Sequence, residues 1–92
     1  MTSRSVDVTN PLGLHARAAA RFVHLASRFT SQIRVARDTR EMDGKSIMGI
    51  LLLAAACGTT LVISAEGVDE AGAVAALADL VESGFEEESW NG

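Results

Sequence analysis

One histidine stands where helix geometry favours the chemistry of an anionic group. His15 follows the turn Asn10-Pro11-Leu12-Gly13 and directly precedes a predicted helix that begins at Ala16. The first amides of a helix, here those of Ala16, Arg17 and Ala18, lack partners within the helix, and the helix dipole adds partial positive charge. The Arg17 guanidinium contributes further donors. A phosphoryl group on an imidazole nitrogen of His15 would be stabilised there, although a histidine that only caps the helix fits the same spacing.

A second informative segment follows Ser46. This serine is a good N-cap for a short helix predicted over Ile47–Leu53, whose inward face would be Ile50 and Leu53. The remaining large side chains of that helix cannot all point inward too, so some of them are expected to form an exposed docking surface: Ile47, Met48, Leu51 and Leu52. Filling the core is the alternative role for these side chains.

The helix predicted after His15, over Ala16–Phe29, carries two opposite stripes. Its apolar stripe recurs at three- and four-residue spacing and is made of Ala19, Phe22, Val23, Ala26 and Phe29. The other stripe is basic and is made of Arg17, Arg21, His24 and Arg28. This basic stripe would contact acidic partners, or it is simply the solvated face of the helix. We assign His24 to that face rather than to a second phosphoacceptor site.

Periodicity places these residues on seven elements in the order β-α-β-β-α-β-α. Besides the two helices above, it predicts a strand at Val6 to Val8, a strand containing Ile33 and Val35, a short strand ending at Met42 after a turn at Asp38-Thr39, a strand over Thr60–Glu66, and a last helix capped by Asp69, with Val74, Leu77, Ala78 and Val81 buried and Gly84 at its end. Gly58 is expected to end the middle segment. An α+β fold follows, with three helices on one face of a four-stranded antiparallel sheet.

Length and composition predict a single domain over residues 1–85. The chain has 92 residues, 48% of them hydrophobic and 22% charged, which is typical of a small globular domain. Residues 86–92, EEESWNG, form an acidic tail that is expected to be disordered. The composition gives no sign of an oligomer, and a monomer is the default expectation.

The charge pattern argues against nucleic acid as a ligand. The net charge is −4, and all eight basic residues lie between Arg4 and Lys45, whereas the chain from Ser46 onward carries eight acids and no base. Tyrosine is absent and Trp90 is the only tryptophan, so no aromatic platform for bases is expected. An anionic group or acidic protein surface remains a plausible partner for the basic half.

The single cysteine limits metal and redox chemistry. Cys57 has no second cysteine with which to form an intrachain disulfide or a zinc site, and we expect it to be a small core residue. No metal or cofactor is therefore expected. The N-terminus lacks the apolar stretch of a signal peptide and no segment is long enough to insert into a membrane, which predicts a cytoplasmic protein.

Three segments, in this order, carry a family resemblance. NPLGLHARAAARF, then GKSIMGI, then GTTLVISAEG resemble the HPr family of histidine-containing phosphocarrier proteins of the bacterial phosphotransferase system. The likeness extends from Ser5 to Phe85. It implies an open-faced β-sandwich of four antiparallel strands and three helices. Ala18 departs from the family pattern, in which many members have a proline, and alanine is tolerated in a first helical turn.

The resemblance also implies a role for each matched residue. His15 would accept a phosphoryl group from phosphohistidine on Enzyme I, which takes it from phosphoenolpyruvate, and pass it to the acceptor domain of a sugar permease or a regulatory protein. Arg17 would steady the phosphate, and the chain would be a carrier rather than an enzyme. Ser46 would be phosphorylated by an HPr serine kinase/phosphorylase, which weakens transfer to the histidine.

Two other functions fit parts of the sequence. A regulatory adaptor would bind a kinase, a permease domain or a transcription factor according to its own phosphorylation, with little role in sugar transport. An α+β module that binds a small molecule without being phosphorylated is possible only if the GLHAR segment matches by accident. The intact His15 favours the carrier, because an adaptor regulated only through serine has no need of it.

Overall fold

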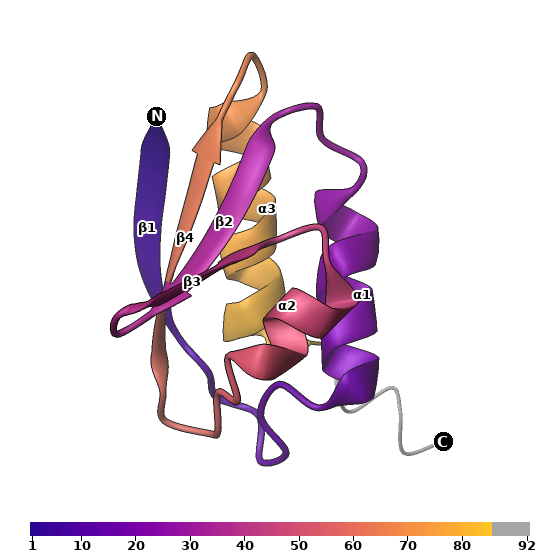
Figure 1. Ribbon diagram of the computed structural model, residues 1–92, viewed down its shortest axis with the longest axis vertical. Coiled ribbons are helices and arrows are strands. Elements are labelled where there is room, and N and C mark those ends of the chain that lie inside the picture. The colour runs from indigo at the N-terminus through magenta and orange to yellow at the C-terminus, as the bar shows by residue number, and fades with distance from the viewer. Residues whose placement is uncertain (86–92) are drawn as a thin grey trace.

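The computed structural model describes residues 1–85, so the tail expected to be disordered, residues 86–92, lies outside the described residues. Seven elements follow one another in the predicted order (Figure 1). They are β1 (Thr2–Asp7), α1 (Ala16–Ala26), β2 (Gln32–Arg37), β3 (Arg40–Asp43), α2 (Ile47–Leu52), β4 (Thr60–Glu66) and α3 (Glu70–Glu82).

The strands form one antiparallel sheet with the order β1-β4-β2-β3. β4 lies between β1 and β2 and pairs with both, so the last strand in sequence joins the first strand to the second. β2 and β3 form a hairpin in which Arg37 pairs with Arg40, and Asp38 in its two-residue turn has a φ of 54°. Asp is one of the residues that tolerate this left-handed conformation. The predicted α+β class and sheet are confirmed.

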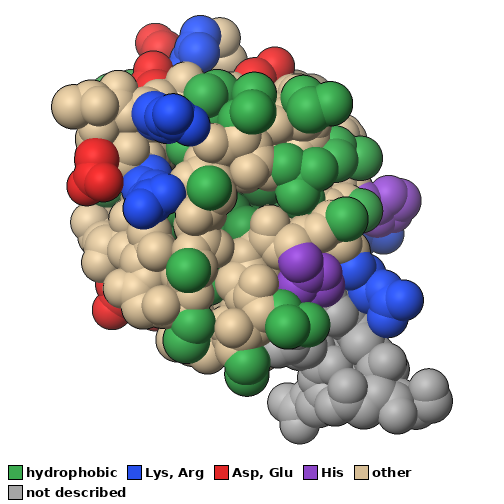
Figure 2. Space-filling view, turned by 60° about the horizontal axis from the view of Figure 1, so that its bottom comes forward, with side chains coloured by type: hydrophobic (Ala, Val, Ile, Leu, Met, Phe, Trp, Pro, Cys, Tyr) green, Lys and Arg blue, Asp and Glu red, His purple; other side chains and the backbone are tan. Residues whose placement is uncertain are grey.

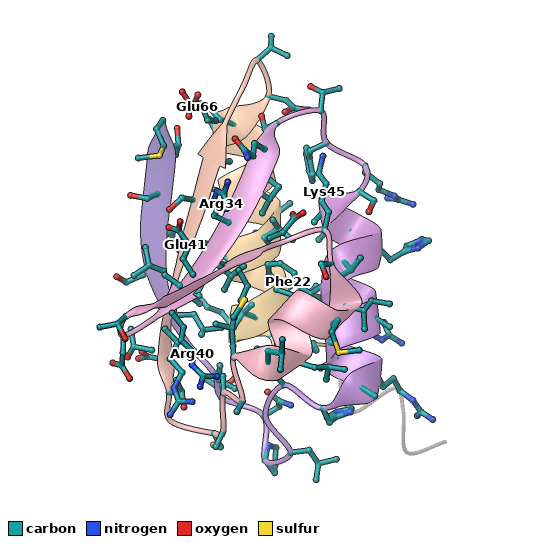
Figure 3. All side chains as sticks on the ribbon, viewed as in Figure 1. Phe22, Arg34, Arg40, Glu41, Lys45 and Glu66 are labelled. Carbon is teal, nitrogen blue, oxygen red and sulfur yellow. The ribbon has the colours of Figure 1, made fainter. Side chains whose placement is uncertain are left out.

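The core lies between the helices and one face of the sheet. Alternate strand residues point into it, namely Val6 on β1, Ile33 and Val35 on β2, and Leu61, Ile63 and Ala65 on β4. The other face of the sheet is open and polar, and Figure 3 shows on it Arg34 of β2 and Glu41 of β3, whose charged groups lie 4.0 Å apart. The helices contribute their predicted apolar stripes to the core, including Phe22 of α1 and Leu77 of α3. The sheet is therefore open-faced, as predicted.

Two helix ends differ from the predicted ones. α1 ends at Ala26 rather than Phe29, because Ser27 turns its hydroxyl back to the Val23 carbonyl and the next amides bond three residues back instead of four. α2 ends at Leu52, well before Gly58, because Ala54 adopts a φ of 51° without being glycine. The carbonyls at this end accept hydrogen bonds from arginines of the hairpin, which holds the residues after α2 in place.

Two side chains, those of Asp69 and Cys57, make different contacts from the predicted ones. Asp69 occupies the N-cap position of α3, but its carboxylate makes no cap hydrogen bond and instead accepts from Thr30 and Ser31 in the loop after α1. Cys57 is exposed rather than a core residue, with its Sγ 3.6 Å from the Thr9 carbonyl. Within residues 1–85 no helix is both long and apolar enough to span a membrane.

Candidate functional site

His15 is the N-cap of α1. Its backbone is extended, with φ −76° and ψ 177°, and its carbonyl accepts the Ala19 amide at 2.9 Å. The imidazole Nδ1 accepts the Arg17 amide at 3.2 Å, so this nitrogen faces the amino end of the helix. The side chain is half-buried and its Nε2 atom is buried. The predicted helix-cap geometry is thus present, and it directs one ring nitrogen to the point where an anion is favoured.

The loop before His15 packs against the segment that follows α2. Asn10 is buried and donates its side-chain amide to the Gly13 carbonyl at 2.8 Å. Gly13 has a φ of 64°, and a Cβ built on it would lie 2.5 Å from the Ala55 carbonyl oxygen. The Leu14 amide donates to that same oxygen at 2.9 Å. Sequence reasoning did not single out Asn10 or Gly13 as positioning residues, although the Asn-Pro and Leu-Gly pairs mark a constrained turn.

The first turn of α1 contains no acidic side chain, so its amides and the helix dipole are not neutralised by a carboxylate of that turn. Arg17 and Ala16 are exposed, whereas the Ala18 side chain is fully buried and brings the helix close to the core. Of the three predicted phosphate-contacting amides, the structure shows that of Arg17 bonded to the His15 ring.

An apolar patch lies on α2. It consists of Ile47, Met48 and Leu52, which are 46%, 67% and 51% exposed. Leu51, which was predicted with them, is half-buried and packs against the core, so the alternative role applies to that residue. Leu12, in the loop before His15, is 69% exposed and was not predicted as a surface residue. Figure 2, which turns the bottom of Figure 1 forward, shows hydrophobic side chains on the same face as the histidines.

Ser46 caps α2 as predicted. Its Oγ accepts the Gly49 amide at 3.1 Å, and its side chain is only half-buried. A Cβ added to Gly49 would lie 3.4 Å from that oxygen, so glycine keeps the cap closely packed. The hydroxyl therefore lies at the edge of the apolar patch, where an added charge would be close to any docked partner.

The basic stripe runs along an open groove between α1 and α3. On one side the groove is lined by Arg17, Ala20, Arg21, His24 and Leu25 of α1 and by Arg28 just after the helix, and Leu80 of α3 closes it. Arg21 is half-buried, whereas Arg17, His24 and Arg28 are exposed. The predicted stripe is therefore present, and it borders apolar side chains rather than facing only solvent.

The comparison with protein families decides where the chain belongs. The model described as "PTS HPr component phosphorylation site" matches residues 2–83. The chain belongs to the HPr family. It is similar to phosphocarrier protein HPr of Neisseria meningitidis, with 45% identity over 87 residues, covering 95% of this chain and 98% of that protein. It is also similar to HPr of Treponema pallidum, with 47% identity over 88 residues, covering 96% of this chain and 100% of that protein.

Solved structures agree with this family and fold. HPr-C-His from Thermoanaerobacter tengcongensis is 48% identical, has a TM-score of 0.91 and covers 95% of this chain and 98% of its own. Crh, the Bacillus subtilis catabolite repression protein solved as a swapped dimer, is 40% identical with a TM-score of 0.74, covering 91% of this chain and 97% of its own. The predicted HPr-like architecture is confirmed. This HPr chain is a phosphoryl carrier of the phosphotransferase system and not a catalytic enzyme.

Proposed function

We propose that His15 is the phosphoacceptor of this carrier, and that it takes the group on Nδ1. The main support for this proposal is the 3.2 Å hydrogen bond from the Arg17 amide to Nδ1. An imidazole nitrogen that accepts a hydrogen bond is unprotonated, so its lone pair can bond to phosphorus once that hydrogen bond is released. In the transfer, that lone pair bonds to phosphorus while the nitrogen–phosphorus bond of the donor phosphohistidine breaks. The oxygens of the transferred group then replace Nδ1 as acceptors for the Arg17 amide.

Arg17 and the neighbouring amides are proposed to hold the transferred phosphate. The backbone of Ala16, Arg17 and Ala18 supplies donors at the helix start, and the exposed Arg17 guanidinium supplies a charge-assisted fork. Phosphoryl transfer depends mainly on positioning and on stabilising charge, so a carrier needs no base of its own. Each partner brings the remainder of the site.

The partners proposed are Enzyme I as donor and the acceptor domain of a sugar permease or regulatory protein. Both would cover His15 in turn from a cytoplasmic location, with this chain acting as a monomer. The apolar patch and the basic stripe provide the contact surface, with Arg21, His24 and Arg28 meeting acidic groups and Ile47, Met48 and Leu52 meeting apolar ones. Leu51 contributes through its exposed part only.

Phosphorylation of Ser46 by an HPr serine kinase/phosphorylase is proposed to reduce this docking. A phosphoryl group adds a charge of about −2 and would sit at the edge of the apolar patch. Its oxygens would still accept the Gly49 amide, so the helix is expected to survive the modification. A regulatory adaptor is the second candidate, supported by the 40% identity to Crh, whose name refers to catabolite repression.

Labelled phosphate tests the carrier chemistry. Label from phosphoenolpyruvate is passed through Enzyme I to the wild-type protein, to His15→Ala and to the matched control His24→Ala. The expected result is an acid-labile label on the wild type and on His24→Ala, and none on His15→Ala. Label retained by His15→Ala would remove the assigned acceptor. A folded wild-type protein that takes no label from a competent Enzyme I would instead favour the adaptor.

A further inference from the structure

The groove between α1 and α3 has a character that phosphoryl transfer alone does not require. Its wall is basic along α1, at Arg17, Arg21 and His24, and at Arg28 just after the helix, and its apolar side chains Ala20, Leu25 and Leu80 are grouped beside that wall. An acidic segment that also carries a large apolar side chain would satisfy both features at once. The chain contains such a segment, because Glu86-Glu87-Glu88 is followed by Trp90.

The described residues end at Phe85, directly after α3, one of the two helices that form this groove. α1 and α3 lie side by side, and the carboxyl end of α3 lies at the same end of the molecule as the start of α1 (Figure 1). A Cβ built on Gly84 would lie 3.5 Å from the Cβ of Asn10, in the loop that leads to His15. Phe85, the last described residue, is fully buried and fixes the point from which the following residues leave. Their starting point is thus held close to the Arg17 end of the groove.

The reach of the segment matches the length of the groove. Arg17 and Leu25 are separated by about 12 Å along the axis of α1, from the rise of 1.5 Å per residue. An extended chain covers at most about 3.3–3.6 Å per residue, so Trp90, five residues after Phe85, can reach about 17 Å. The three glutamates would then lie near Arg17 and Arg21, and the indole would reach Leu25 and Leu80.

We propose that residues 86–92 bind in the groove between α1 and α3 of their own chain, with Glu86-Glu87-Glu88 against the basic stripe and Trp90 against Ala20, Leu25 and Leu80. A segment tethered at Phe85 is present at the groove at an effective concentration in the mM range, so even a weak contact is populated. Bound in this way, the segment covers part of the surface that acidic partners would use and must yield to them. It also gives Trp90 a place in the molecule.

The fluorescence of Trp90 can report this contact, because Trp90 is the only tryptophan and the chain has no tyrosine. We expect its emission in the full-length protein to be shifted to shorter wavelength than that of the free peptide EEESWNG. Its acrylamide quenching constant is expected to be lower by about two-fold or more, as for a contact populated most of the time. Adding the peptide EEESFNG, which has no tryptophan emission of its own, in excess over this mM effective concentration is expected to reverse both changes.

Charge variants locate the contact. Arg21→Glu is expected to return the quenching constant to the peptide value, whereas Arg34→Glu on the open face of the sheet is the control that leaves it unchanged. Glu87→Arg is expected to weaken the contact, and combining it with Arg21→Glu is expected to restore it. No phosphate is involved, so these results are independent of the proposed carrier chemistry.

Three outcomes would overturn the proposal. The first is a Trp90 in the full-length protein that is quenched as readily as in the peptide, which would support the disorder predicted from composition. The second is a protected Trp90 that ignores every groove variant, because it would then lie elsewhere. The third is protection that depends on protein concentration, because the contact would then join two copies.

Discussion

At the scale of single residues, His15 combines two roles that the spacing alone presents as alternatives. Its Nδ1 accepts the Arg17 amide, which is the action of a helix cap. The same contact holds the ring with one nitrogen at the helix start, where an anion is favoured. The cap is confirmed and the phosphoacceptor role stays a proposal, but the two do not compete. A cap that accepts through a nitrogen lone pair already points the nucleophile at the site of the incoming phosphate.

Removing the Arg17 guanidinium is expected to slow phosphate transfer with little effect on the stability of the fold. A hydrogen bond to a charged group contributes about 1.5–3 kcal/mol, so Arg17→Ala is expected to slow phosphate transfer from Enzyme I by about 10- to 100-fold. The side chain is exposed, so the free energy of unfolding should change by no more than about 0.5 kcal/mol. Initial transfer rates and urea unfolding measure the two effects, with Arg34→Ala as the control. Unchanged transfer by Arg17→Ala would contradict the assigned role.

Asp69 is expected to make stability depend on acid pH. The Ser31 hydroxyl, followed by the Thr30 amide, lowers the pKa of Asp69 from 3.8 to about 2. Because the pKa is lower in the folded state, this carboxylate stabilises the fold fully above its unfolded pKa and loses that effect as the pH falls from 3.8 to about 2. The stability advantage of the wild type over Asp69→Asn should therefore vanish across that interval.

Urea midpoints between pH 2 and 7 measure this dependence. Asp79→Asn, at an exposed position of α3, is the control, and its profile should follow that of the wild type. If the difference between wild type and Asp69→Asn is the same at pH 7 as at pH 2, the contacts with the loop after α1 do not stabilise the fold through the ionised carboxylate.

At the scale of elements, α2 joins a structural cap to the proposed regulatory site. Ser46→Ala removes the oxygen that accepts the Gly49 amide and is expected to cost about 1 kcal/mol of stability. Ser46→Asp keeps an acceptor at the cap, so its stability should stay near that of the wild type, while its charge weakens binding to Enzyme I beside the apolar patch. Thermal unfolding and Enzyme I affinity separate these effects.

The control for charge alone is Ser64→Asp, on the open face of the sheet. Its affinity for Enzyme I should match that of the wild type, because the added charge is remote from the patch. Equal affinity for the wild type and Ser46→Asp would remove the support for regulation at this serine. Loss of stability in both Ser46 variants would show that the hydroxyl itself, and not just an acceptor, is required.

Elements with a regular apolar period were predictable, whereas their ends and polar contacts were not. The strand over Thr60–Glu66 was predicted with the observed bounds, because Leu61, Ile63 and Ala65 alternate with polar residues. The end of α1 depends on the Ser27 hydroxyl, and a serine fits a helix interior as well as a helix end. Ala54 ends α2 in a conformation that sequence rules assign to glycine.

The site was predictable to the same extent. His15, Arg17 and Ser46 follow from local sequence, because a helix start is set by neighbouring residues. The carboxylate of Asp69 was assigned to a cap because its partners Thr30 and Ser31 lie about 40 positions away, at 39 and 38 residues of separation. The exposure of Leu12 was not predicted because it lies in a turn, where no helical period separates inward from outward side chains.

At the scale of the whole molecule, the basic stripe gathers positive charge along one groove of a chain whose net charge is −4. The basic residues of α1 line one groove, and the acidic half of the sequence ends with three glutamates that follow Phe85. A net charge of −4 would repel acidic partners at long range, so the basic stripe provides the local field that reverses this near His15. If residues 86–92 bind as proposed, they and the transferred phosphate draw on the same positive charges at the start of α1.

This sharing predicts that phosphorylation of His15 loosens the proposed contact of residues 86–92. The phosphoryl group adds negative charge beside Arg17, close to where the glutamates would lie, and the repulsion between exposed charges amounts to about 0.5–1 kcal/mol. The fraction of protein with the segment released should rise by about two- to five-fold, which acrylamide quenching of Trp90 before and after phosphorylation by Enzyme I measures. His15→Ala treated identically is the control and should show no change.

The coupling must act in both directions, because two sites that share one free energy affect each other equally. Replacing Glu86, Glu87 and Glu88 by glutamine should therefore shift the equilibrium of phosphate exchange with Enzyme I toward the phosphorylated carrier, by the same factor that phosphorylation applies to the segment. Ionic strength near 1 M should suppress both effects, since the screening length falls to about 3 Å. Quenching that is identical in the phosphorylated and unphosphorylated protein, with the segment bound in both, would show that the phosphate and the glutamates occupy independent parts of the basic surface.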